Sequence, residues 1–187
     1  TFNSTGNVVI SETGATVLSG VSTADSLDLN STAGISDDGT ADLNVTNLAT
    51  FSGTSITLDD TYAFGTLTFS APAGAAVIEE TDSTDLVGAS AAGSLVLTSG
   101  GGLTDDVNAS LTVTGSGAFE GTAITLGEQG TDTLNLGSLR FNSTGAVVIA
   151  EDEPLLRVSM ADALRKEGWT VDVAADGVKA VAEVTAA

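Results

Sequence analysis

The stretch LDLNSTAGISDDGTADLNVTNLATFSGTSITL (residues 27–58) recurs without a gap as LVLTSGGGLTDDVNASLTVTGSGAFEGTAITL (residues 95–126). A long period, here about 68 residues, built from short apolar doublets and Gly, Asn, Asp and Ser turns is typical of repeat architectures. The repeat continues outward, because TFNSTGNVVISE (1–12) returns as TFSAPAGAAVIEE (68–80) and as RFNSTGAVVIAED (140–152). The chain up to about residue 150 is therefore interpreted as a repeated scaffold.

Within each copy the apolar residues alternate with polar ones, which places their side chains on one face of short strands. The residues between the strands are turn formers such as Asp-Asp-Gly and Ser-Thr-Gly. Short, evenly spaced strands that repeat in register predict an all-β fold, a right-handed parallel β-helix with about three coils per copy. A β-sandwich is the rival, but nothing in a sandwich requires a copied sequence. The doublets are Leu27/Leu29, Leu43/Val45, Ile56/Leu58 and Leu67/Phe69, then Leu95/Leu97, Leu111/Val113, Ile124/Leu126 and Leu139/Phe141.

Composition excludes several classes of function. The chain has 25 Asp and Glu against 5 Lys and Arg, a net charge of −20, so we expect no nucleic-acid binding. It has no Cys and no His, which removes thiolate chemistry and the commonest general base. No apolar stretch reaches the roughly 18 residues of a membrane span, so no membrane insertion is predicted.

Paired aspartates in the turns are the candidate ligands of the repeat region. Carboxylate and carbonyl oxygens in turns are what Ca²⁺ takes as ligands. A calcium site therefore competes with the simpler interpretation of a solvated turn, and no other cofactor is predicted. The candidate residues are Asp37, Asp38, Asp105 and Asp106.

A different kind of sequence takes over after residue 150. Residues 151–187 hold the only Met, the only Trp and four of the five basic residues, and their pattern predicts helix, strand, helix. This segment is predicted to be a small α/β cap over the end of the solenoid, which makes two domains, 1–150 and 151–187. A cap would cover strand edges that otherwise associate.

The run VVIAEDEPLLRVSMADALRKEGWTVDVAADGVKAVAEV (residues 147–184) resembles the N-terminal part of a bacterial response-regulator receiver domain. The resemblance implies that Glu151 and Asp152 correspond to the acidic pair that holds Mg²⁺ in that family. The chain ends before the third strand that carries the phosphoacceptor, so the resemblance implies a truncated remnant or a chimera. A receiver-like signalling module in the cytoplasm is the alternative function.

The repeat region, through NSTGNVVISE, LNSTAGISDD, FSGTSITL and their copies, is similar to β-helical repeats of large bacterial surface and adhesin-type proteins. That resemblance implies a secreted or cell-surface structural segment that self-associates or binds a glycan or protein ligand. A polysaccharide-active β-helix enzyme is the rival. We do not expect catalysis, because acidic residues that recur from copy to copy do not form one unique constellation.

Overall fold

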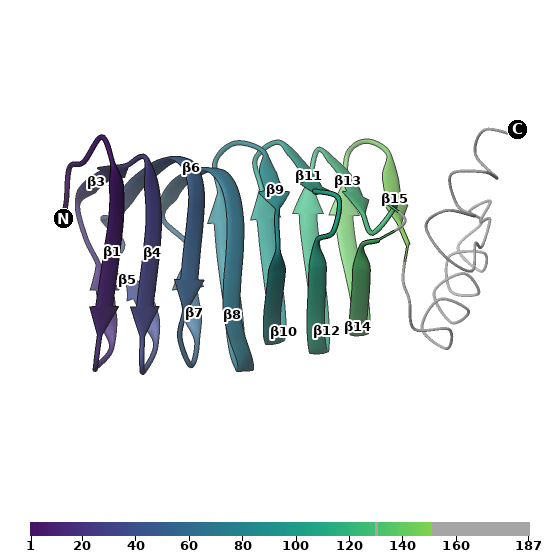
Figure 1. The fold of residues 1–187 in the computed structure, drawn as a ribbon. Coiled ribbons are helices and arrows are strands. Elements are labelled where there is room, and N and C mark those ends of the chain that lie inside the picture. The colour runs from purple at the N-terminus through teal and green to yellow at the C-terminus, as the bar shows by residue number, and fades with distance from the viewer. Residues whose placement is uncertain (130, 151–187) are drawn as a thin grey trace, which may run out of the picture.

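The computed structural model describes residues 1–129 and 131–150, which form fifteen parallel strands and no helix. The strands are β1 (Asn7–Glu12), β2 (Thr16–Leu18), β3 (Val21–Ala24), β4 (Ser26–Ser31), β5 (Ile35–Asp37), β6 (Asp42–Ser52), β7 (Ile56–Leu58), β8 (Thr61–Glu80), β9 (Thr84–Leu86), β10 (Ala89–Ser99), β11 (Gly102–Asp105), β12 (Ser110–Gly121), β13 (Ala123–Leu126), β14 (Thr133–Ser143) and β15 (Val147–Ile149). Figure 1 shows them side by side along a rod, from β1 at one end to β15 at the other.

The rod confirms the predicted all-β parallel solenoid, while its hand stays a prediction. The predicted cap, 151–187, lies outside the described residues. Within the described ranges no helix is long and apolar enough to span a membrane.

Three stacks of strands surround the axis, and we call them sides A, B and C. Side A contains β1, β4, the later part of β6, the middle of β8 and the first residues of β10, β12 and β14. Side B contains β2, β5, β7 and the C-terminal parts of β8, β10, β12 and β14. Side C contains β3 and the first residues of β6 and β8. After β8, the strands β9, β11, β13 and β15 follow side B in each coil, and Leu86 of β9 stacks on Leu67 in the middle of β8, where side A begins.

The coils differ in length, because their turns and bulges differ. A short coil runs from Ala49 to Leu67, and a longer one runs from Ile124 to Val147. Seven coils stack on side B, through Thr16, Ile35, Ile56, Ala76, Leu95, Gly117 and Leu139.

One copy of the sequence repeat is longer than a whole number of coils. Following the pairing from Leu27 through three coils leads to Ala49, Leu67 and Leu86. The sequence counterpart of Leu27 is Leu95, which lies beyond Leu86 and stacks on Ala76 of side B. One repeat is therefore three coils plus one side.

Counterparts in the sequence consequently face in different directions around the rod. The three copies of the motif that begins Thr-Phe or Arg-Phe, here called the TF/RF motif, show this through Phe2, Phe69 and Phe141. Asn3, beside Phe2, pairs with Thr23 of side C. Phe69 stacks on Phe51 of side A, and Phe141 stacks on Phe119 of side B. The repeats wind around the axis by about one side per copy.

Strand β8 marks the phase change of the repeat, the place where equivalent turns move from one side of the coil to the next. Its 20 residues pass through sides C, A and B without a turn, bending only where the register shifts. Before β8, a left-handed glycine at Gly20 or Gly39 separates sides B and C. After it, the left-handed positions Gly88, Asn108 and Gly127 follow β9, β11 and β13 instead.

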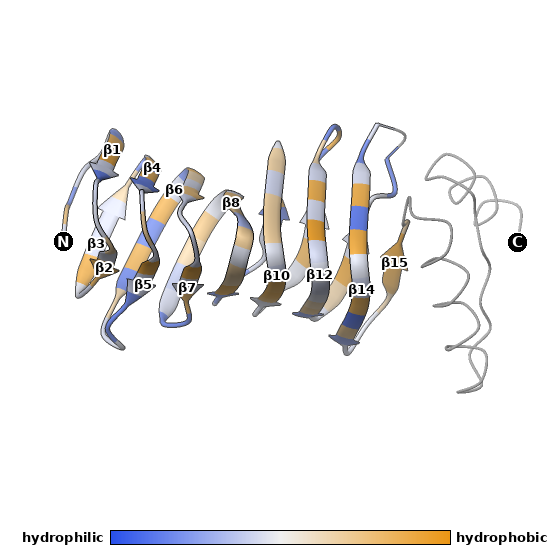
Figure 2. Cartoon of the chain, turned by 90° about the horizontal axis from the view of Figure 1, so that it is seen from below, coloured by the Kyte–Doolittle hydropathy of each residue, from blue (hydrophilic) through white to orange (hydrophobic). Residues whose placement is uncertain are grey.

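The core fills the space inside the coils with the predicted apolar doublets. Leu27, Leu29, Leu95 and Leu97 are all at most 2% exposed. Figure 2 shows the resulting alternation of hydrophobic and hydrophilic positions along β12 and β14. Burial of this alternating face is the main stabilising contribution, since each fully buried Leu or Phe contributes roughly 1.5–3 kcal/mol.

A ladder of glycines lets successive coils approach closely at one corner. A Cβ on Gly93 would lie 2.9 Å from the carbonyl oxygen of Gly74, and a Cβ on Gly115 would lie 2.6 Å from that of Gly93. Gly137 continues the ladder over Gly115. These contacts are with backbone atoms, which cannot rotate away.

Replacing Gly115 by alanine is expected to lower the free energy of unfolding by about 1–3 kcal/mol, because the added methyl forces two coils apart. The matched control is Gly102→Ala, where a Cβ meets nothing within 4 Å. The control is expected to be neutral or to stabilise by up to about 1 kcal/mol. Urea unfolding followed by circular dichroism measures both, and equal losses would contradict the close-approach explanation.

Candidate functional site

The first aspartate of each predicted pair joins two coils. Asp37 Oδ2 accepts a hydrogen bond from the N–H of Asp59 at 2.9 Å, and Asp105 Oδ2 accepts one from the N–H of Gly127 at 2.8 Å. These bonds are copies of each other, because their acceptors are repeat counterparts and so are their donors. In the first copy the hydroxyl of Tyr62 also donates to Asp37 Oδ2, at 2.8 Å. The repeated acid acts as a cap between coils.

The second aspartate of each pair holds its own turn. Asp38 Oδ1 accepts from the N–H and the hydroxyl of Thr40, at 3.0 and 2.6 Å. Asp106 Oδ1 accepts from the N–H of Val107 at 2.8 Å. These are the local side-chain to backbone bonds that make Asp a turn former.

The two aspartate pairs are not brought together. Asp37 stacks on Leu18 of side B, whereas Asp105 stacks on Leu86 of β9, several coils away. Among residues 1–129 and 131–150, no group of three or more His, Cys, Asp or Glu side chains is placed to hold a metal ion. Calcium binding at these turns stays a prediction.

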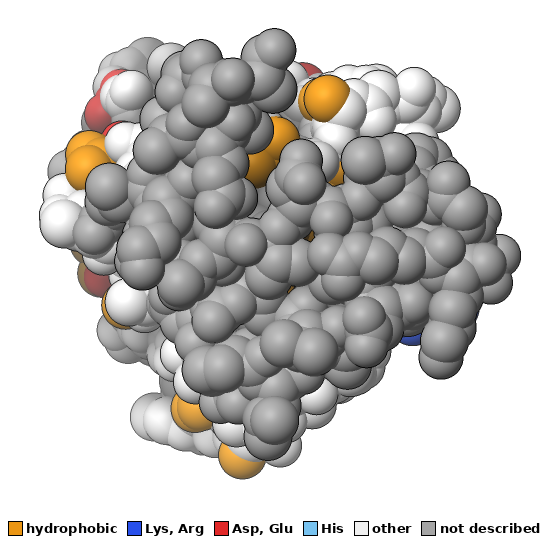
Figure 3. Space-filling view, turned by 90° about the vertical axis from the view of Figure 1, so that its right-hand side faces the viewer, with side chains coloured by type: hydrophobic (Ala, Val, Ile, Leu, Met, Phe, Trp, Pro, Cys, Tyr) orange, Lys and Arg blue, Asp and Glu red, His pale blue; other side chains and the backbone are white. Residues whose placement is uncertain are grey.

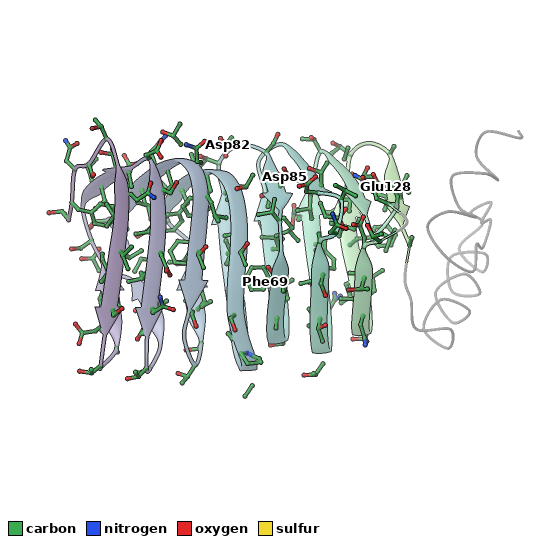
Figure 4. The ribbon with its side chains drawn as sticks, in the orientation of Figure 1. Phe69, Asp82, Asp85 and Glu128 are labelled. Carbon is green, nitrogen blue, oxygen red and sulfur yellow. The ribbon has the colours of Figure 1, made fainter. Side chains whose placement is uncertain are left out.

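Two further carboxylates surround Asp105 in the turn between β13 and β14. Burial raises the pKa of Asp105 to about 7, and the charges of Asp132 and Glu128 add to the rise, while the Gly127 N–H opposes it. One oxygen each of Asp105, Glu128 and Asp132 is buried without a hydrogen-bond partner in the structure. Figure 4 shows Glu128 near the β15 end of the rod. We therefore expect Asp105 to be partly protonated at neutral pH.

Glu80 is the most deeply buried acid of the described residues, with only 1% of its surface exposed. Its Oε2 accepts the N–H of Phe64 at 3.1 Å, whereas Oε1 and the nearby Thr84 hydroxyl oxygen lack a well-aligned partner. Burial raises the pKa of Glu80 to about 7; Thr84 and the Phe64 N–H lower it, and Asp82 raises it slightly. Such a perturbed acid marks a functional site only when a cleft reaches it.

Sequence reasoning missed Glu80 and gave Asp105 only as a calcium candidate. A signal was present for Glu80, because it follows Ile78 at a spacing of two and therefore shares its inward face. No comparable signal shows that the pKa of Asp105 is raised, since the acids that contribute to the rise come from a turn of the following coil.

The outer surface carries a shallow hollow of about 220 Å³ on side B, over β10, β12 and β14. Val96, Ala118 and Arg140 form its floor as one stacked column, and Asn142 donates to Glu120 at 3.1 Å beside them. Arg140 is the single Lys or Arg in residues 1–150. The hollow is open, and its wall holds one carboxylate and one guanidinium, whereas glycoside hydrolysis uses two carboxylates.

The acidic pair Glu151 and Asp152 lies outside the described residues. The segment expected to resemble the first receiver strand is Val147–Ala150. Its residues Val147–Ile149 form β15, which pairs in parallel with Ile124–Leu126 of β13. Its place is thus in the solenoid, and the structure lends no support to the receiver resemblance. Figure 3 views the rod from this end, with acidic and hydrophobic side chains of the described residues visible at the rim.

Comparison with known protein families gives a match to a family described as repeats of unknown function (DUF5649), over residues 5–71 and 73–149. The chain belongs to this repeat family. No curated protein and no solved structure matches it. The family match supports the repeat interpretation and ends at residue 149, before most of the receiver-like segment.

The two DUF5649 units meet inside β8, between residues 71 and 73. β8 is also the strand at which equivalent turns move to the next side of the rod. The boundary between the two family matches therefore coincides with the boundary between the two structural repeats. A DUF5649 unit is thus about three coils plus one side, and successive units present the same turns on successive sides of the rod.

Proposed function

We propose that this chain is a non-catalytic structural segment of a secreted or cell-surface protein, a rigid spacer whose polar outer surface serves adhesion and self-association. The observation that carries the proposal is the repeated hydrogen bond of the turn acids, Asp37 to Asp59 and Asp105 to Gly127. An acid that caps the following coil in both copies has a structural role.

The outer face supports the same conclusion. Its outward positions along side A are small and mostly polar, and each stacks on the next from coil to coil. Such a surface offers many weak hydrogen-bonding groups, which favours multivalent contact with a glycan or another rod. One outward column consists of Ser11, Asn30, Ser52, Ser70, Ala91, Thr112 and Asn135.

The proposal is tested with the full chain, by light scattering and by incubation with neutral and acidic polysaccharides. The net charge of −20 opposes association at low salt, so we expect larger assemblies at about 1 M than at about 0.1 M NaCl, where screening shortens the Debye length from about 10 to about 3 Å. We expect the protein to bind to the polysaccharides and to leave the length of the polysaccharide chains unchanged. Monomers at every salt concentration, or cleavage of polysaccharide that Glu120→Gln abolishes, would overturn the proposal.

A further inference from the structure

The strand that ends the TF/RF motif has the same neighbour, an Ile-Thr-Leu strand, in the second and third copies of the motif. In the second copy, Ala76–Ile78 of β8 pairs with Ile56–Leu58 of β7. In the third copy, Val147–Ile149 of β15 pairs with Ile124–Leu126 of β13. Both neighbours read Ile-Thr-Leu, both pairings are parallel, and both neighbours lie one coil earlier in the chain. The repeat therefore specifies an Ile-Thr-Leu strand on the N-terminal side of this motif.

The first copy of the motif, Val8–Ile10 of β1, has no such neighbour among the described residues. β1 pairs with β4 on one edge only. Val8 and Ile10 are only partly buried although they pack against the core, and Val9 is 71% exposed. The two Ile-Thr-Leu strands of this chain are already occupied by their own partners.

We propose that the edge of β1 opposite β4 takes an Ile-Thr-Leu strand of another DUF5649 repeat, added in parallel with Ile over Val8, Thr over Val9 and Leu over Ile10. This inference rests on the proposed scaffold role. An incoming Ile and Leu continue the inward columns of Val8 and Ile10, and the Thr lies outward over Val9. Addition of a strand to an open sheet edge supplies backbone hydrogen bonds, and the alternate side chains supply the specificity.

Charge favours the same edge. Glu12 is the only acid among residues 1–24, whereas the later coils carry several acids each, such as Asp37, Asp38 and Asp42. Elsewhere on the rod an approaching acidic repeat meets like charge, and at the first coil it meets little. A repeat with the composition of the two in this chain is acidic, so this end is where repulsion opposes its docking least.

The test places a known strand at the edge by extending the full chain. Residues 48–67 are copied in front of Thr1, because Thr1 and Thr68 begin the same motif. This puts Ile-Thr-Leu one coil ahead of Val8–Ile10. The control extension carries Asn-Thr-Asn in place of Ile-Thr-Leu. We expect amide hydrogen exchange over Asn7–Glu12 to slow at least tenfold with the matched extension only, and equal exchange in the two extended chains would overturn the proposal.

The register is tested separately, using the absence of cysteine from the chain. A cysteine at the Thr of the extension is combined with Val9→Cys, or with Val17→Cys, which is 59% exposed and lies on side B. A short thiol cross-linker should join the first pair and leave the second unjoined, whereas equal yields would contradict the register. Polysaccharide cleavage would refute the scaffold role and leave this pairing standing, so the two failures are distinguishable.

Discussion

Replacing Glu80 by glutamine is expected to make the protein's stability less dependent on pH. Between about pH 5.5 and pH 8.5 the natural chain should lose about 2 kcal/mol of its free energy of unfolding through ionisation of Glu80, and Glu80→Gln should not show this loss. The folded pKa of Glu80, about 7, lies above its ordinary value of 4.5. The stabilisation from its protonated form is thus complete below about pH 4.5 and disappears as the pH rises through 7. The loss accumulates only up to the folded pKa, because above it both the folded and the unfolded chain carry the ionised carboxylate.

Urea unfolding at the two pH values measures this change. The matched control is Glu79→Gln, which alters the net charge equally but lies at an exposed position beside Glu80. The control should keep the full pH dependence. Glu80→Gln should keep the part due to Asp105, whose pKa is also raised to about 7, and to Asp59 and Asp85, whose pKa values burial also raises. An unchanged pH dependence in Glu80→Gln would show that Glu80 titrates normally in the folded protein.

Replacing Phe69 by alanine is expected to cost about 3–5 kcal/mol of stability, the range for a large aromatic removed from a packed core. Phe69 is 0% exposed and stacks on Phe51 in the preceding coil. Figure 4 shows it between the strand layers of the rod. The substitution would leave a cavity beside β8, the strand in which the two DUF5649 units meet.

The matched control is Phe141→Ala, which removes the counterpart of Phe69 in the next copy. Phe141 is 38% exposed, so its removal is expected to cost only about 1–2 kcal/mol. Thermal or urea unfolding of the two variants compares them directly. Equal losses would contradict the difference in burial.

Much of the fold was predictable because strand alternation is local. The doublets Leu27/Leu29 and Leu95/Leu97 identify inward positions from spacing alone, and all four side chains are buried. The repeat itself predicted stacked coils, since equivalent sequences need equivalent surroundings. The C-terminal pair Leu139/Phe141 is less buried than its pattern suggests, because it lies in the last described coil.

The phase of the repeat was not predictable in this way. The sequence predicts about three coils per copy, but the number of residues in a coil depends on turns and bulges whose geometry is set by contacts between coils. Gly65 illustrates this, because it lies at the register shift between β6 and β8, where its backbone passes close to Thr46 of the preceding coil. A pattern read along the chain contains no information about that contact.

The candidate site was only partly predictable for the same reason. The sequence identified Asp37 and Asp105 as repeated turn acids, and the structure shows what the repetition serves, a cap on the following coil. The buried position of Glu80 follows from its parity with Ile78, whereas its raised pKa depends on the coils that enclose it.

The central claim, that each repeat advances by three coils plus one side, is tested most directly by spin-label distances. Thr57 and Ala118 stack on one column of side B three coils apart, so labels there should be separated by about 14 Å between attachment points. Thr125, the sequence counterpart of Thr57, lies in β13 away from side B. The account predicts a clearly longer distance for Thr57 with Thr125 than for Thr57 with Ala118. A distance of only three strand spacings for Thr57 with Thr125 would mean that the repeats stack in phase, and would contradict the account.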